Sequence, residues 1–154
     1  MKKKVRDKAL SILERKDQTE YQMTKALTDA GYSEEETSDA VEWLKELKYI
    51  DDLDYARRYL DVLVAKGRGR IRIRQEMSKR GLSGEEIYNI IDDGFSPETE
   101  RENALKIALK LKESLPSDVE KQKLMRKLSS KLATQGYNYD IVNSIINSVL
   151  NPDD

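Results

Sequence analysis

Residues 26–33 read ALTDAGYS, and two later stretches repeat the pattern: EMSKRGLS at 76–83 and KLATQGYN at 131–138. In each stretch an apolar residue lies four positions before the glycine, another follows it, and Ser or Asn comes next. Glycine just past a helix end adopts a left-handed backbone without steric cost, and Ser or Asn two residues later suits the N-cap of another helix. Each stretch therefore predicts a helix, a tight turn and a second helix.

A further amphipathic segment lies upstream of each glycine turn, so the predicted unit has three helices. The glycines are 50 and 55 residues apart, which exceeds the period of a two-helix repeat of the tetratricopeptide type. Turn residues near Asp51 and Pro97 interrupt the helical pattern and mark the boundaries. We predict an all-α protein of three tandem three-helix units, at residues 1–50, 51–95 and 96–154, in an elongated or curved molecule.

The composition excludes several kinds of chemistry. The chain has no cysteine and no histidine, which removes thiolate nucleophiles, imidazole bases, disulfides and the usual transition-metal ligands. We therefore expect no enzyme activity, no cofactor and no metal. The basic start of the chain is not followed by the apolar run of a signal peptide, and no stretch is long enough to span a bilayer. We expect a cytoplasmic protein without a membrane contact.

Positive charge is concentrated in residues 66–80, KGRGRIRIRQEMSKR, although the whole chain has a net charge of -1. The alternation of Arg and Ile could indicate a strand. Ile73 and Met77, however, lie four residues apart, as on one face of a helix, so we predict a helix that begins near Arg70. We predict that this run binds an anionic partner through its seven basic residues: Lys66, Arg68, Arg70, Arg72, Arg74, Lys79 and Arg80.

Stability alone gives no reason for these cations, because positive charges in a first helical turn oppose the helix dipole. We therefore expect Arg68, Arg70, Arg72 and Arg74 to be exposed. On this interpretation their joint replacement by alanine weakens partner binding and leaves thermal stability unchanged or slightly improved. The alternative interpretation is a solvated charged face without a partner.

Three other features have simpler structural explanations. The glycines of residues 67–69 lack the spacing and the preceding strand of a phosphate-binding loop. The carboxylates at 51, 52 and 54 do not have the ligand pattern of an EF-hand, and we expect Asp51 or Asp52 to cap a helix. Tyr55 and Tyr59 could stack on nucleic-acid bases near the basic run, but their spacing favours partial burial in a core.

Two successive segments resemble the RecX family. They are Tyr49-Ile50-Asp51-Asp52-x-x-Tyr55-Ala56 and Gly67-x-Gly69-x-x-Arg72-Ile73-x-x-Glu76, and the pair is more specific than either alone. The similarity extends over about residues 5–92 and reaches the last third of the chain only through its helical pattern. Three positions depart from the family pattern: Arg70 where Pro is common, Gln22-Met23 where Glu-Leu is expected, and Met77 in place of Leu.

The resemblance implies tandem three-helix units and a role in regulating the RecA recombinase in DNA repair, recombination and the SOS response. The implied partners are the RecA filament and single-stranded DNA, with double-stranded DNA as a further ligand and with the protein acting as a monomer. The implied effect is suppression of ATP hydrolysis and strand exchange by RecA. Two other interpretations stay open: a free-standing DNA-binding module of the helix-turn-helix type, and a helical-repeat scaffold without a nucleic-acid ligand.

Overall fold

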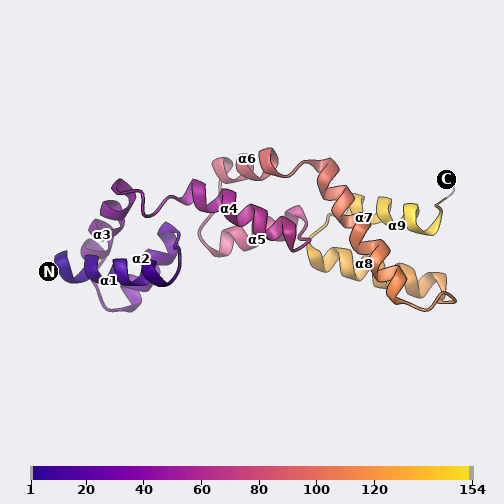
Figure 1. Ribbon diagram of the computed structural model, residues 1–154, viewed down its shortest axis with the longest axis horizontal. Helices are drawn as coiled ribbons and strands as arrows, with labels where there is room; N and C mark the ends of the chain where they lie inside the picture. The colour runs from indigo at the N-terminus through magenta and orange to yellow at the C-terminus, as the bar shows by residue number, and fades with distance from the viewer. Residues whose placement is uncertain (1, 153–154) are drawn as a thin grey trace.

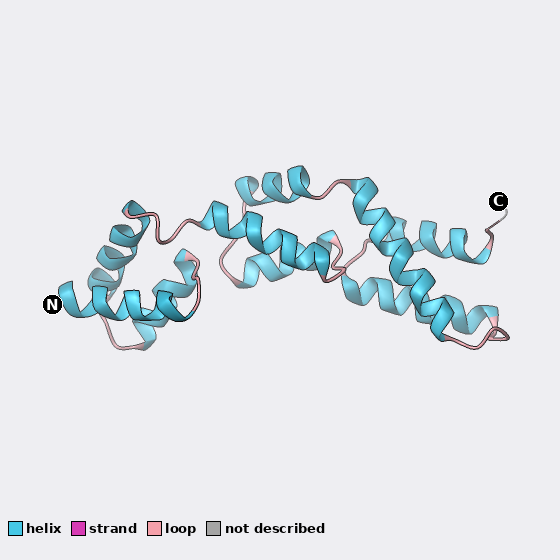
Figure 2. Cartoon of the chain, viewed as in Figure 1, coloured by secondary structure: helices cyan, strands magenta, loops and turns pink. Residues whose placement is uncertain are grey.

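The computed structural model describes residues 2–152, and these residues form helices without any strand (Figure 2). The prediction of an all-α protein is confirmed. The helices are α1 (Lys2–Arg15), α2 (Glu20–Asp29), α3 (Glu34–Glu46), α4 (Asp52–Ala65), α5 (Arg70–Lys79), α6 (Glu85–Gly94), α7 (Pro97–Ser114), α8 (Lys121–Gln135) and α9 (Tyr139–Leu150).

The helices pack in threes around three separate hydrophobic clusters. One cluster joins α1, α2 and α3 around Leu27, Leu44 and their neighbours. A second joins α4, α5 and α6, and a third joins α7, α8 and α9. We refer to these groups as units 1, 2 and 3. They follow one another along an elongated molecule, with the two ends of the chain at opposite ends (Figure 1).

The second helices of the three units, α2, α5 and α8, meet end to end along one edge of the molecule (Figure 1). At the junction of units 1 and 2, the Thr19 hydroxyl at the start of α2 donates to the Arg80 carbonyl at the end of α5, over 2.6 Å. At the junction of units 2 and 3, the Gly69 amide donates to the Gln135 carbonyl over 2.8 Å, and Ile71 donates to Gly136 over 3.0 Å. The same relation therefore connects each unit to the next.

The glycine turns follow the predicted backbone geometry. Gly31, Gly81 and Gly136 have φ values of 97°, 80° and 100°, in the left-handed region. Ser33 and Asn138 cap the helices that follow, as predicted. The same prediction is wrong for Ser83. Helix α6 begins one residue later, after Gly84 with φ of 96°, and it has no side-chain cap.

Two further predictions of helix ends are confirmed. The Asp51 carboxylate accepts a hydrogen bond from the Asp54 amide and caps α4, so this acidic cluster closes a helix end. Pro97 occupies the first turn of α7, where its missing N–H leaves no helical hydrogen bond unmade.

Candidate functional site

The basic run of residues 66–80 lies in the middle of the molecule, around α5. This helix begins at Arg70, as predicted, and Ile73 and Met77 turn one of its faces into the core of unit 2. The seven predicted site residues divide into two sets. Lys66, Arg74 and Lys79 are exposed, whereas the other four are partly buried: Arg68, Arg70, Arg72 and Arg80.

Arg70 is not the exposed cation that the sequence suggested. Its side chain is only 19% exposed and lies 2.6 Å from the Asp92 carboxylate and 3.5 Å from the Glu100 carboxylate. The guanidinium also donates to the Phe95 carbonyl, while the Arg70 amide donates to Glu100 over 2.7 Å. Glu100 is 3% exposed. Since Gly69 offers no side-chain cap, Glu100 from unit 3 takes this role at the start of α5.

Arg68 and Arg72 both reach the end of α8 in unit 3. The Arg68 guanidinium donates to the Gln135 side chain. Arg72 donates to the Thr134 carbonyl over 3.0 Å and lies 3.6 Å from the Glu76 carboxylate. A cation beside the last carbonyls of a helix interacts favourably with the helix dipole. These arginines therefore help to hold units 2 and 3 together.

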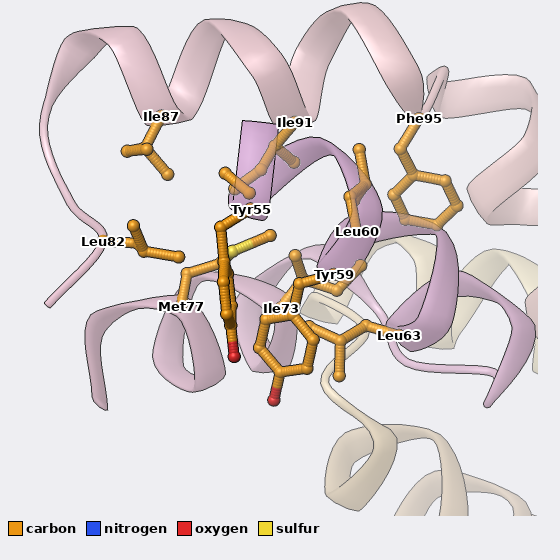
Figure 3. Close-up of a cluster of buried hydrophobic side chains, with 11 residues drawn as sticks. Tyr55, Tyr59, Leu60, Leu63, Ile73, Met77, Leu82, Ile87, Ile91 and Phe95 are labelled. Atoms are coloured by element: carbon orange, nitrogen blue, oxygen red, sulfur yellow. The ribbon is translucent and has the colours of Figure 1, made fainter. Parts of the chain in front are cut away.

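Two more of the arginines lie over aromatic rings. The Arg80 guanidinium lies 3.9 Å from the centre of the Tyr59 ring and donates to the Tyr55 hydroxyl. Figure 3 shows both tyrosines among the core side chains of unit 2. The favoured interpretation of these rings as core residues is correct, and they are not free to stack on bases. Arg74 lies 4.4 Å above the ring of the exposed Tyr88.

The geometry changes the expected effect of removing the four arginines. Deleting Arg70 leaves the buried Glu100 carboxylate without its cation, and breaking a buried ion pair is strongly destabilising. The expectation that the quadruple alanine variant keeps its stability assumed four exposed arginines. That assumption is wrong for Arg68, Arg70 and Arg72, which are partly buried. The basic run of residues 66–80, which we call the basic cluster from here on, still has more cations than carboxylate partners. Its exposed members are Lys66, Arg74 and Lys79, and Lys79 lies 3.3 Å from the Glu76 carboxylate.

Sequence reasoning missed Glu100, because it reads as an ordinary acid in the first turn of a helix. Among the residues that the structure describes, no group of three or more acidic side chains is placed to hold a metal ion. No helix within residues 2–152 combines the length and apolar character needed to cross a membrane.

Tyr137 joins units 2 and 3 through a buried phenol, whose hydroxyl donates to the Gly67 carbonyl over 2.7 Å. Burial raises the pKa of Tyr137 to about 12, and the nearby Glu100 carboxylate acts in the same direction. Below pH 10 the phenol is neutral in both the folded and the unfolded chain. Between pH 10 and 12 only the unfolded chain loses the proton, so the free energy of unfolding falls as the pH rises.

We expect Tyr137→Phe to flatten this dependence by up to about 1.4 kcal/mol per pH unit between pH 10 and 12. The measurement is urea unfolding, followed by circular dichroism at several pH values. Tyr139→Phe removes an exposed hydroxyl two residues away and is the matched control. An unchanged slope in Tyr137→Phe would contradict the burial of a neutral phenol.

Two family models match the chain. The model for the first three-helix domain of RecX matches residues 6–44, and the model for the second matches residues 51–88; together they cover half of the chain. Among curated proteins, a regulatory protein RecX of Clostridium botulinum is 33% identical over 150 residues, which cover 96% of this chain and 69% of that protein. Another, from Vibrio vulnificus, is 33% identical over 93 residues, which cover 60% of this chain and 58% of that protein.

Solved structures have the same fold. The crystal structure of RecX from Lactobacillus salivarius superposes with a TM-score of 0.81 at 24% identity, covering 96% of both chains. A second crystal structure of a regulatory protein RecX superposes with a TM-score of 0.80 at 26% identity, covering 94% of this chain and 70% of the other.

Proposed function

Because this chain belongs to the RecX family of regulatory proteins, we propose that it is a non-catalytic regulator of the RecA filament on single-stranded DNA. It binds the filament as a monomer in the cytoplasm and suppresses ATP hydrolysis and strand exchange by RecA. Its role in repair, recombination and the SOS response follows from this activity. Double-stranded DNA is a further ligand.

The observation that carries the proposal is the edge formed by α2, α5 and α8, with the basic cluster at its centre. A filament on DNA offers a long groove with a repeating pattern of charge, and an elongated molecule contacts more of such a groove than a compact one. The two junctions between units tie this edge together through hydrogen bonds to backbone carbonyls. In this arrangement, Lys66, Arg74 and Lys79 project charge from the middle of the molecule.

The charge of the third helices argues against the free-standing helix-turn-helix module. In such a module the second helix of the motif enters the major groove and must tolerate the phosphates on either side. The helices after the glycine turns of units 1 and 2 are acidic: α3 has six acidic residues and one basic residue, and α6 has four acidic residues and no basic one. Phosphates repel both helices.

We expect addition of the protein to lower the DNA-dependent ATPase of RecA until the effect saturates, while the protein alone hydrolyses no ATP. The measurement is steady-state ATP hydrolysis by RecA on a single-stranded oligonucleotide, titrated with the pure protein. A rate of ATP hydrolysis by RecA that is unchanged at saturating protein would contradict the proposed regulation. Hydrolysis by the protein alone would contradict its non-catalytic character.

The same assay tests the basic cluster without disturbing the buried arginines. Replacing Lys66, Arg74 and Lys79 by glutamine removes three exposed cations. Exposed charge pairs contribute about 0.5 kcal/mol each, or about 1.5 kcal/mol for three, so the concentration for half-maximal inhibition should rise about tenfold. Lys8, Arg15 and Lys25 in unit 1 are also exposed, and their replacement is the control with the same loss of charge. Equal effects of the two variants would assign inhibition to net charge instead of the cluster.

A further inference from the structure

Helix α8 has a second concentration of positive charge, which lies outside the basic run of residues 66–80. Its 15 residues, Lys121–Gln135, include five basic side chains and no acidic one. Four of them lie along the body of the helix and are exposed: Lys123, Arg126, Lys127 and Lys131. Within residues 2–152, none of these four takes part in an ion pair or a side-chain hydrogen bond. The contrast with Arg70, Arg72 and Arg80 is clear, because those arginines have intramolecular partners.

The four cations share one side of the helix. Leu124, Leu128 and Leu132 form the buried seam of α8, in the core of unit 3. Lys123, Lys127 and Lys131 follow each other at intervals of four residues on the solvent side, with Arg126 beside them. Residues four apart on a helix are about 6 Å from each other, and like charges at this spacing destabilise a helix by a few tenths of a kcal/mol per pair. Stability of the helix therefore does not explain the row.

The row continues across the junction into unit 2. Thr134 lies one turn beyond Lys131 on the same side of α8, and its carbonyl accepts the Arg72 guanidinium over 3.0 Å. Arg68 bonds to the next side chain, Gln135. Because a helix rises 1.5 Å per residue, the cations form a strip at least about 16 Å long, from Lys123 to Arg72. We call this set the α8 strip: Lys123, Arg126, Lys127, Lys131, Arg72 and Arg68, of which the last two already donate to Thr134 and Gln135 at the junction.

The carboxylates nearest in sequence to the α8 cations lie outside α8. Asp118 and Glu120 precede the first turn of α8, and Glu76 faces Arg72 from one turn along α5 at 3.6 Å. The exposed middle of the strip has no acid on its own helix.

We propose that the α8 strip is a binding surface for the phosphate backbone of single-stranded nucleic acid. A row of cations spaced along a straight helix suits a ligand with regularly repeated charges, and each neutralised phosphate releases condensed counterions. Flexible lysine stems let the ammonium groups follow a backbone without fixed register, so the surface selects for charge and not for base sequence. This assignment rests on the proposed function, which already includes DNA as a partner, and it deepens that function by placing phosphate contacts on α8 of unit 3.

The test is fluorescence anisotropy of a labelled oligothymidylate with the full chain, without RecA, over a series of salt concentrations. Replacing Lys123, Arg126, Lys127 and Lys131 by glutamine removes the charge and keeps a good helix former at each position. A phosphate contact on a single strand contributes about 0.7 to the slope of log K against log salt. The slope should therefore flatten by about 3, and affinity at 0.1 M salt should fall on the order of 100-fold.

The matched control replaces Lys3, Lys8, Arg15 and Lys25, four exposed cations in unit 1 with the same composition. It should keep most of the affinity and the slope, and circular dichroism should show both variants folded. An α8 variant that binds with the parental slope, or a control that loses as much as the α8 variant, would overturn the proposal. So would an α8 variant that keeps oligonucleotide binding but no longer binds RecA filaments, since the strip would then face an acidic protein surface. Because the binding assay omits RecA, its failure is separate from a failure of the ATPase test.

Discussion

Replacing Gly136 by alanine is expected to lower the free energy of unfolding by about 3 kcal/mol or more. Gly136 has a φ of 100°, where a side chain already costs about 1–2 kcal/mol. An added Cβ would also lie 2.5 Å from the Arg72 nitrogen and closer still to the Arg72 Cβ. Backbone atoms at a helix start cannot move away cheaply, so the junction of units 2 and 3 must open or distort. Chemical unfolding followed by circular dichroism measures the loss.

Gly31→Ala is the matched control for this prediction. Gly31 ends α2 with nearly the same backbone, φ 97°, but nothing lies within 4 Å of an added Cβ. Its replacement should lower the free energy of unfolding by only the about 1–2 kcal/mol of backbone strain. The difference between the two variants therefore isolates the contact between units 2 and 3. If both variants lose the same stability, the close approach of Gly136 to α5 is refuted.

Glu100→Gln is expected to lower the free energy of unfolding by about 3 kcal/mol. The amide keeps the shape of the side chain and can still accept the hydrogen bond from the Arg70 amide. It removes the negative charge, however, and leaves the Arg70 guanidinium, 19% exposed, with the Phe95 carbonyl and the surface carboxylate of Asp92 but without its buried counter-charge. Uncompensated charge in a partly buried site is costly because little water can solvate it.

Asp92→Asn separates the buried partner of Arg70 from the exposed one. The Asp92 side chain is 57% exposed, and exposed ion pairs contribute about 1 kcal/mol or less. We expect the Asp92 variant to lose at most a third of the stability that Glu100→Gln loses. The double variant Glu100→Gln with Arg70→Met should recover part of the loss, because it removes both charges of the pair. No recovery in the double variant would show that Glu100 acts through something other than Arg70.

The variants of Gly136 and Glu100 also bear on function, because both residues lie at the junction of units 2 and 3, where the basic cluster meets α8. Arg72 and Arg68 belong to the second unit and reach the end of α8 in the third. A junction opened by Gly136→Ala would separate the α8 row from these two arginines. The oligonucleotide affinity of that variant should therefore fall together with its stability.

Local features of the sequence predicted most of the fold. The glycines at 31, 81 and 136 mark helix ends because only a residue without a Cβ adopts the left-handed backbone freely. The apolar spacing around them predicted which faces are buried, as Ile73 and Met77 illustrate. Such signals are readable because backbone sterics and helix periodicity act over a few residues. The same signals failed at Ser83, where the glycine that follows it delays the start of α6 by one residue.

The sequence by itself determined the all-helical fold, the glycine turns and the place of the basic run, since each depends on neighbouring residues. Only the tertiary structure decided what the basic side chains do. Arg70 meets a carboxylate 30 residues away, and Arg72 meets a carbonyl 62 residues away. Pairs so distant in the chain depend on how one unit abuts the next, which no local pattern encodes. The structure therefore assigned Arg70 to the junction and left the cations of α8, which no sequence feature had singled out, exposed to solvent.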